Sequence, residues 1–389
     1  MSNIKIKKIA IFISSFRAGG GEINMINLAN NFVDRGFKVD LLVMKPVGKC
    51  RDMIKSSVNI VNVDSGRIIF SIPRIISYLR KNRPNFIIAT DEFSHIISLT
   101  SVKLSLVRTK TVFRVGNMFS ILFSRYKGLK QGVIIPFIAK RIYRYADIFI
   151  ANSFGVADDI ENFFKISKKK INIIHNPKKI KKIIEMSKKD AGHNWVDEKD
   201  LPVILFAGRL REQKNIPILI RAFAETSSRI PSRLLLIGIG RERARLERLV
   251  KELNIDKFVD FFGFSENPYS FMSKVDIFAT TSIWEGFSNS LQEAMICGAP
   301  VIATDCSSGP REMIAPDTDP LHRMNSGVEY GKYGILVPMN KVEEVSTAME
   351  NLLKNKEIKE KYSKLSSLRG ESFNSNKIFD QYLEALNLK

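Results

Sequence analysis

Short apolar runs alternate along the chain with segments of helical periodicity. The first run, Lys8–Ser15, is followed by a glycine loop, an amphipathic helical pattern over Glu22–Arg35 and a second apolar run at Lys38–Met44. Further runs in the first half lie at Asn85–Thr90, Thr111–Val115, Asp147–Ala151 and Ile171–Asn176. Strands of this kind separated by helices are typical of βαβ units on a parallel sheet. The first half therefore predicts a doubly wound α/β domain.

A lysine-rich polar stretch over residues 178–200 interrupts this pattern, which then resumes after Leu201-Pro202. The second series has apolar runs at Val203–Ala207, Leu234–Gly238, Val259–Phe262, Ile277–Thr281 and Val301–Thr304, and helical segments at Pro217–Ser228, Arg241–Leu253 and Ser290–Cys297. We therefore expect a first domain over residues 1–180, a linker at 181–200 and a second domain over 201–372. A C-terminal helix over 373–389 could pack back on the first domain.

Two Rossmann-like, doubly wound domains that face each other across a cleft are the architecture that we expect. In such α/β folds, ligands bind outside the carboxyl ends of the strands. The cleft is therefore the expected site.

The composition removes several classes of protein. At 389 residues and 44% hydrophobic content, the chain is long and apolar enough to fold into two domains. Three scattered cysteines exclude a disulfide framework and a cysteine-based zinc site, and the four histidines show no metal-ligand spacing. Asp317-Thr318-Asp319 lies between two prolines, so we interpret it as a surface turn. We expect neither a metal nor a cofactor.

The N-terminal run Ile9–Ile13 follows three lysines, as in a signal peptide, but it is short and precedes glycines rather than a cleavage site. We interpret it as a first strand. No apolar run approaches the roughly 18 residues that span a bilayer. We therefore expect a cytoplasmic protein.

The positive charge is concentrated in the first half of the chain. Residues 1–200 carry 36 Lys and Arg against 16 Asp and Glu, whereas residues 201–389 carry 25 against 24. This asymmetry favours an anionic partner for the first half, either a membrane surface or a nucleic acid. A solvated lysine-rich surface is the alternative.

Two glycine-rich turns follow predicted strands. Gly19, Gly20 and Gly21 precede the first helical pattern, where glycines let a backbone approach a ligand and a helix start favours an anion. Gly238-Ile239-Gly240 lacks the third glycine of a dinucleotide-binding fingerprint, so we interpret it as a helix-opening turn.

Charged residues follow two strands of the second domain. Arg209 and Lys214 lie on the loop after Val203–Ala207, where two cations suit a diphosphate, although an ordinary surface loop would look the same. Glu285 and Glu293 lie eight positions apart across a strand, loop and helix start. For Glu293, the spacing Ser290-x-x-Glu293 could instead be a capping box.

The backbone amides of Asn289, Ser290 and Leu291 begin this last helix. We expect them to point into the cleft, where they could bind phosphate.

In order along the chain, these motifs resemble family 4 of the retaining, nucleotide-sugar-dependent glycosyltransferases, which have the GT-B fold. The motifs that carry the resemblance are the Gly-Gly-x-Glu loop, IIHNP at 173–177, AGRLREQKN at 207–215, the Glu285/Glu293 pair, SSGPREMI at 307–314 and YGKYGILVP at 330–338. SSGPREMI is similar to members that transfer sugars onto lipid-linked oligosaccharides. The resemblance implies transfer of a hexose or N-acetylhexosamine from a nucleoside-diphosphate sugar, with UDP favoured, to a lipid-linked or polysaccharide acceptor in surface-glycan biosynthesis.

The resemblance also implies roles for single residues. Arg209 and Lys214 match the cations that hold the donor diphosphate, which agrees with cations placed where negative charge develops. Glu285 matches the carboxylate beside the donor sugar, in a supporting role and not as a nucleophile, and Glu293 matches the carboxylate that binds the ribose. Phe264 matches the nucleobase slot. Gly20 and Gly21 would close over the phosphates.

The chain departs from the family at one position of the first domain. Many relatives carry a histidine after a strand there, but this chain reads Arg114-Val115-Gly116-Asn117, so Asn117 is our candidate beside the donor sugar. His95 is nearby in sequence, yet a half-buried helix start explains it equally well.

The first domain of this fold binds the acceptor, and residues 124–145 of that domain mix basic with apolar and aromatic residues. This composition suits a surface lying in the lipid interface, so we expect a peripheral protein on the inner face of the membrane. A core helix with one basic face is the alternative. Two other functions stay open, a nucleotide-sugar epimerase or hydrolase of similar fold and a basic nucleic-acid binder, although no nucleic-acid-binding module is visible.

Overall fold

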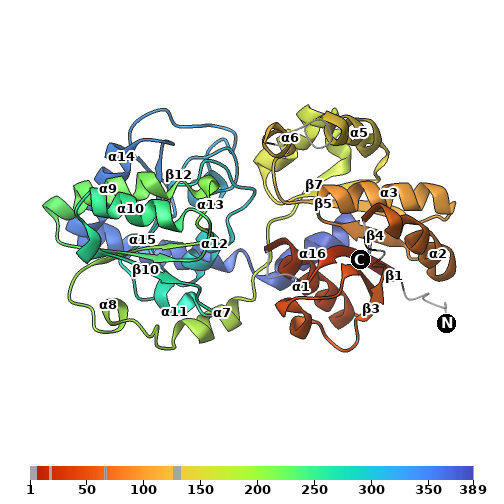
Figure 1. Ribbon diagram of the computed structural model, residues 1–389, viewed down its shortest axis with the longest axis horizontal. Coiled ribbons are helices and arrows are strands. Elements are labelled where there is room, and N and C mark those ends of the chain that lie inside the picture. The colour runs from red at the N-terminus through yellow and green to blue at the C-terminus, as the bar shows by residue number, and fades with distance from the viewer. Residues whose placement is uncertain (1–6, 17–19, 65, 67, 126–132, 389) are drawn as a thin grey trace. The chain divides into compact units, whose positions relative to one another are not determined.

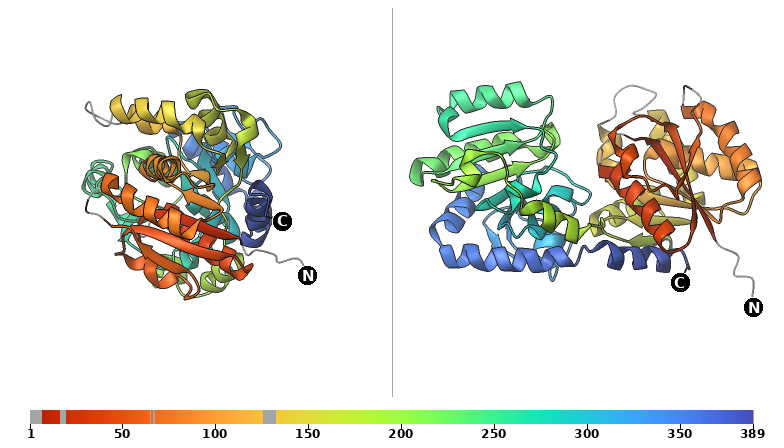
Figure 2. Two further views of the ribbon diagram at one scale, coloured as in Figure 1. Left: turned by 90° about the vertical axis from the view of Figure 1, so that its right-hand side faces the viewer. Right: turned by 90° about the horizontal axis from the view of Figure 1, so that it is seen from below.

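The computed structural model describes residues 7–16, 20–64, 66, 68–125 and 133–388. The chain divides into two compact units, one of Met1–Asn176 with Phe379–Lys389 and one of Pro177–Ile378. Each unit is built on a seven-stranded sheet that carries helices on both faces (Figures 1 and 2). The two Rossmann-like domains predicted from the apolar pattern are therefore confirmed.

The first sheet has the strand order β3-β2-β1-β4-β5-β6-β7, and all its neighbouring strands are parallel. Its strands are β1 (Lys8–Ser15), β2 (Lys38–Lys45), β3 (Asn59–Asn62), β4 (Phe86–Ala89), β5 (Lys110–Val115), β6 (Ile148–Ala151) and β7 (Ile171–Ile173). The order reverses between β1 and β4, which is where sheets of this topology bind ligands. The apolar pattern did not reveal β3, because this edge strand is polar and mostly exposed.

Helices cover both faces of the first sheet. They are α1 (Gly20–Asp34), α2 (Ile72–Asn82), α3 (Glu92–Ser105), α4 (Phe119–Ser124), α5 (Ile135–Ile142) and α6 (Phe154–Phe164). Ala10 and Phe12 of β1 pack with residues of α2 and α3. The last helix, α16 (Ser375–Ala385), ends in this unit: the Phe379 ring lies 4.8 Å from the Phe32 ring of α1, and Asp380 pairs with Arg35.

The second sheet has the order β10-β9-β8-β11-β12-β14-β13, with only β13 antiparallel to its neighbour among the described strands. Its strands are β8 (Val203–Ala207), β9 (Arg233–Ile237), β10 (Val259–Gly263), β11 (Ile277–Thr280), β12 (Val301–Thr304), β13 (Glu329–Tyr330) and β14 (Ile335–Val337). Its helices are α9 (Ile216–Arg229), α10 (Arg243–Glu252), α11 (Tyr269–Met272), α12 (Asn289–Ile296), α13 (Pro310–Ile314), α14 (Val342–Lys354) and α15 (Lys356–Glu371).

Successive residues of β8 enter opposite cores, as the pleat of a strand requires. Ile204 and Phe206 pack with α9, α10 and α14 on one face of the sheet. Val203 and Leu205 pack with α11, α12 and α13 on the other. A fully apolar strand such as β8 is therefore buried on both faces.

Residues 181–200, for which the sequence predicts a linker, contain most of α7 (Ile180–Ser187) and all of α8 (Asn194–Asp197). These helices belong to the second unit, since Ile180 and Ile183 pack against Ile296 of α12. Their apolar positions are spaced as on one face of a helix, but the surrounding lysines hide the pattern. In the described part of the chain, no helix has the length and hydropathy to cross a membrane.

Candidate active site

The carboxyl edge of the second sheet brings together two of the predicted motifs. The loop after β8 carries Arg209 and Lys214, and the loop after β11 carries Glu285. These loops are neighbours because β8 and β11 are paired strands. Four residues separate Arg209 from Lys214 on the first loop. This loop turns through the short 3-10 helix Glu212–Lys214.

Hydrogen bonds between the two loops set their relative position. The Thr281 hydroxyl donates to the carbonyls of Lys214 at 3.2 Å and Asn215 at 3.0 Å. The Ile283 amide donates to the Gln213 carbonyl at 2.9 Å, and the Gln213 side-chain amide donates to the Trp284 carbonyl at 2.8 Å. Backbone groups and uncharged side chains therefore hold the two loops in register, independently of their charged side chains.

Lys214 and Glu285 form an ion pair at this edge. Lys214 Nζ lies 2.5 Å from Glu285 Oε1, with side-chain exposures of 14% and 9%. The Ser282 hydroxyl donates to the same oxygen at 2.7 Å. Glu285 Oε2 makes no hydrogen bond to the described residues, which leaves it available to a ligand.

Positive charge accumulates around Arg209, whose side chain is exposed. The charge of Arg209, together with burial and the charge of Arg241, lowers the pKa of Arg211. A bound polyanion would relieve this repulsion between like charges. The loop is therefore electrostatically suited to a diphosphate.

The turn at Gly238 and Gly240 supports the Arg209 loop. Gly238 has φ 145°, and a Cβ atom there would lie 1.8 Å from the Gly208 carbonyl oxygen, while one at Gly240 would lie 2.1 Å from that of Leu210. The Leu210 amide donates to the Ile239 carbonyl at 3.0 Å. The glycines allow this close approach of two loops. The turn precedes α10, as predicted.

Glu293 projects from α12, which begins at Asn289. Ser288, not Ser290, occupies the N-cap position and makes no side-chain cap bond, so the alternative of a capping box at Ser290 is wrong. Glu293 Oε1 instead lies 2.5 Å from Lys178 Nζ. The amides of Asn289, Ser290 and Leu291 form the first turn, where no helical acceptor exists for them.

The loop after β12 packs against the Glu285 loop. Gly309 has φ 92°, and a Cβ atom there would lie 3.1 Å from the Gly286 oxygen and from Phe287 Cα. The Ser308 hydroxyl donates to the Gly286 carbonyl at 2.8 Å. The SSGPREMI motif therefore supports the backbone next to Glu285.

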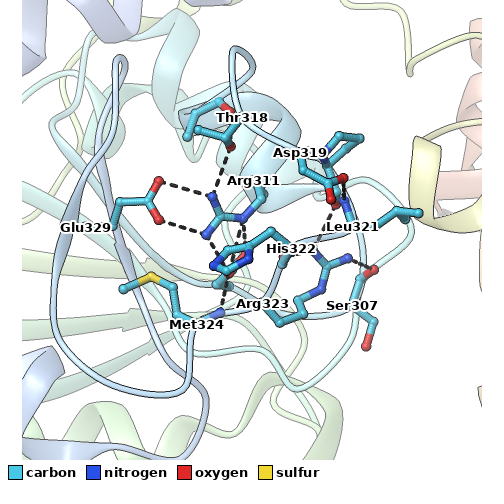
Figure 3. Close-up of polar contacts among 12 residues, drawn as sticks. Ser307, Arg311, Thr318, Asp319, Leu321, His322, Arg323, Met324 and Glu329 are labelled. Carbon is cyan, nitrogen blue, oxygen red and sulfur yellow. Dashed lines mark hydrogen bonds and ion pairs between the residues drawn. The ribbon is translucent and has the colours of Figure 1, made fainter.

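Arg311 anchors this loop through a network shown in Figure 3. Arg311 is 1% exposed, and its guanidinium donates to Asp305, with Nη2 2.7 Å from Oδ2, and to both oxygens of Glu329 at 3.1 and 2.8 Å. It also donates to the Thr318 hydroxyl at 3.0 Å. Such fork-shaped bonding is specific to arginine. The sequence alone predicts no role for Arg311.

Asp317 and Asp319 lie on the exposed turn that the flanking prolines predict. Asp317 pairs with Lys332 at 2.8 Å, and Asp319 accepts the Leu321 amide at 2.9 Å. The contact of Asp319 is local to the turn, whereas that of Asp317 reaches a residue 15 positions further along the chain. Within the described ranges, no group of three or more His, Cys, Asp or Glu side chains could hold a metal ion.

Three predicted residues lie in the first unit. Asn117 is exposed on the loop between β5 and α4, which Asp159 fixes by accepting the Phe119 amide at 2.5 Å. Burial raises the pKa of Asp159, although the hydrogen bonds that it accepts from Ser120 and Phe119 oppose the rise. Gly20 and Gly21 begin α1, and a Cβ atom on Gly21 would meet nothing within 4 Å. The preceding residues 17–19, including Gly19, lie outside the described residues.

Phe264 follows β10 in the second unit and its ring is exposed. It lies directly after the carboxyl end of this strand, which ends at Gly263. Its role stays a prediction.

His95 lies in the first turn of α3, as the alternative of a helix start predicts, but it is fully buried instead of half-buried. Its ring is 1% exposed and stacks on Phe113 with centroids 4.3 Å apart. Nε2 lies 3.1 Å from the Ala89 carbonyl and Nδ1 lies 3.2 Å from the Tyr143 hydroxyl. Burial lowers the pKa of His95 to about 3, so the ring is neutral.

Two family models match this chain. The family model described as "Glycosyl transferases group 1" matches residues 193–367, and the model "Glycosyltransferase Family 4" matches residues 18–178. An uncharacterized glycosyltransferase of Methanocaldococcus jannaschii is 31% identical over 270 residues, which are 68% of this chain and 66% of the relative, so the chain spans just under two thirds of that protein.

A Campylobacter jejuni protein named N-acetylgalactosamine-N,N'-diacetylbacillosaminyl-diphospho-undecaprenol 4-alpha-N-acetylgalactosaminyltransferase is 29% identical over 78% of this chain and 74% of its own length. Among solved structures, HepE of Anabaena in complex with UDP and glucose has a TM-score of 0.78 at 19% identity, with 98% of this chain and 99% of that chain covered.

Proposed function

Because this chain belongs to the glycosyltransferases with the GT-B fold, we propose that it transfers a hexose or N-acetylhexosamine from a UDP-sugar to a lipid-linked or polysaccharide acceptor, with retention of anomeric configuration. The observation that carries the proposal is the partly buried ion pair of Lys214 and Glu285 at the carboxyl edge of the second sheet. UDP is supported by the likeness to HepE, and a lipid-linked acceptor by the name of the Campylobacter relative.

The cations account for departure of the nucleotide. Breaking the bond between sugar and phosphate leaves a diphosphate with added negative charge, which Arg209 and Lys214 would stabilise. The amides of Asn289, Ser290 and Leu291 offer further donors at a helix start. Because side chains and amides would supply the compensating positive charge, we propose that transfer needs no metal and no cofactor.

The carboxylates account for orientation of the donor. Glu285 is held through Oε1, so Oε2 can accept a hydrogen bond from a hydroxyl of the donor sugar. It can also stabilise positive charge on the anomeric carbon. Glu293 would accept the ribose hydroxyls, Phe264 would contact the base, and Gly20 and Gly21 would approach the phosphates. Asn117 would contact the donor sugar. We assign no covalent nucleophile.

Glu285→Gln tests the carboxylate while keeping its size. We expect the rate of transfer to fall about 10²–10³-fold, since one preorganised electrostatic contact is lost. Glu225→Gln, which changes an exposed carboxylate on α9, is the matched control. Product stereochemistry is read by NMR of the anomeric proton, and reaction with EDTA present tests metal independence.

Unchanged transfer by Glu285→Gln would remove the proposed role, and an inverted product would remove retention. Release of free sugar or of an epimer without acceptor would favour the alternative of an epimerase or hydrolase.

We further propose that α5 docks on the cytoplasmic face of an anionic membrane. Ile135 and Ala139 face the core, whereas Phe137 is 56% exposed and Ile138 is partly exposed. The Arg141 guanidinium lies 4.4 Å from the centre of the Phe137 ring. Exposed aromatic and basic side chains together suit a lipid interface. Residues 126–132 of the expected segment lie outside the described residues.

Vesicle flotation tests this surface. We expect binding to vesicles with anionic lipid and weaker binding by Arg141→Ser and Phe137→Ser, with Arg221→Ser on the other unit as the control. Equal recovery with neutral and anionic vesicles would remove the electrostatic part of the proposal. Salt-dependent binding to RNA or DNA instead would favour the nucleic-acid alternative.

A further inference from the structure

Glu293 is paired with a lysine that lies outside every motif assigned a role in the site. Lys178 Nζ and Glu293 Oε1 are 2.5 Å apart, although the residues are 115 positions apart in the sequence. The side chains are 9% and 19% exposed. Glu293 Oε2 makes no hydrogen bond to the described residues. One oxygen is therefore occupied by the ammonium, while the other stays available to a ligand.

No other cation contacts Glu293 in the described part of the chain. Tyr269 and Cys297 also lie near this carboxylate. Burial raises the pKa of Tyr269, and the charge of Glu293 raises it further. The same two causes raise the pKa of Cys297 to about 12. Both groups therefore stay neutral at pH 7, and Lys178 alone balances the charge of Glu293.

The backbone of Lys178 is bound to the end of the same unit. Its amide donates to the Phe373 carbonyl at 2.8 Å, and its carbonyl accepts the Ser375 amide at 2.9 Å. Lys178 and Asn374 thereby form an isolated parallel β-bridge. The second unit runs from Pro177 to Ile378. This bridge therefore joins the segments through which the chain enters and leaves the unit.

We propose that Lys178 is a positioning residue for the nucleotide, which orients Glu293 and couples it to the bridge at residues 373–375. The contact with the ammonium limits the rotamers of Glu293, so less conformational entropy is lost when a ribose binds. Because coupling between sites is reciprocal, a nucleotide that engages Glu293 stabilises the bridge, and loosening the bridge weakens nucleotide binding by the same factor. This inference rests on the proposed binding of ribose by Glu293.

Hydrogen exchange with and without UDP tests the coupling in the unmodified full chain. We expect UDP to slow exchange of the Lys178 and Ser375 amides, which form the bridge. In Lys178→Met, UDP should no longer slow exchange at Ser375. A structural role for Lys178 alone would make exchange faster in both states without changing the response to UDP.

Calorimetric titration with UDP supplies the second readout. We expect Lys178→Met to raise the Kd about 5- to 100-fold, the usual size of coupling between two sites. Lys178→Arg should restore part of the affinity, because it keeps the charge. Lys182→Met, which changes an exposed lysine on α7, should bind as the unmodified chain does. Donor KM should rise while kcat changes little.

The outcomes separate this inference from the function on which it rests. UDP affinity unchanged in Lys178→Met, or a Ser375 amide whose exchange ignores UDP in the unmodified chain, would overturn the coupling. No UDP binding by the unmodified chain, or unchanged binding by Glu293→Gln, would overturn the proposed donor site instead. If Lys178→Met does not fold, Lys178→Gln and the exchange experiment on the unmodified chain decide the question.

Discussion

The ammonium nitrogen of Lys214 lies 2.5 Å from Oε1 of Glu285, across 71 positions of sequence. The cation proposed for the leaving diphosphate is thus held by the carboxylate proposed for the donor sugar. Glu293 has a corresponding partner in Lys178. Each carboxylate of the spaced pair therefore has its own lysine, and each retains one oxygen without a bond to the described residues.

Lys214→Met should lower kcat about 10²–10³-fold, because the leaving diphosphate loses one preorganised cation. It should also lower the thermal midpoint, since Glu285 would stay buried without a counter-charge. Kinetics with saturating donor and a thermal melt measure the two effects. Lys332→Met, which removes an exposed pair with Asp317, should change neither. Full activity in Lys214→Met would contradict its role.

Gly238→Ala should weaken donor binding by displacing the Arg209 loop, because its Cβ would lie 1.8 Å from the Gly208 oxygen. We expect destabilisation by more than about 1 kcal/mol, since φ is also positive at this position. Gly36→Ala is matched for positive φ but meets nothing within 4 Å. Urea unfolding and donor KM should therefore change more in Gly238→Ala. An equal effect of both substitutions would show that loop contact is unimportant.

Arg311→Met should destabilise the second unit by about 3–5 kcal/mol, because Asp305 would keep a buried charge without its partner. Arg311→Lys should cost less, since an ammonium keeps the charge but cannot bond Asp305 and Glu329 in the same forked geometry. Denaturant unfolding measures both. Arg323→Met is the control. Arg323 lies on the loop after α13 and donates to carbonyls instead of carboxylates. If the midpoint of denaturant unfolding were the same in Arg311→Met as in the unmodified chain, the anchoring role would be refuted.

His95 should make the first unit lose stability in mild acid. Its folded pKa is lowered to about 3 by burial, so the unfolded chain binds a proton below about pH 6.5 while the folded chain does not. Its contribution to stability is therefore complete above about pH 6.5. It is lost as pH falls towards 3, by up to about 1.4 kcal/mol per pH unit.

Urea unfolding of the full chain from pH 7 to pH 4, followed by a probe in the first unit, measures this slope. His95→Gln keeps a polar group for Tyr143 and should give a shallower slope. The same slope in both proteins would assign the acid sensitivity to other groups.

Most of both sheets could be predicted from the sequence, because central parallel strands are buried on both faces and are uniformly apolar. The apolar runs place β1, β8 and β12 at the bounds that the structure has. The edge strand β3 and helix α7 could not be found in this way. Polar or charged residues make up half of each segment, and only tertiary packing selects the apolar positions that they bury.

The sequence by itself determined the α/β class and the order of the charged motifs, because apolar periodicity and motif spacing are local properties. The resemblance of these motifs to known glycosyltransferases indicated the family. The retaining mechanism and the donor sugar stay predictions. Only the tertiary structure decided that Lys214 pairs with Glu285, that Lys178 pairs with Glu293 and that His95 is a core residue. Such pairing depends on which strand ends become neighbours in a sheet, and long-range contact of this kind leaves no periodic signal in one sequence.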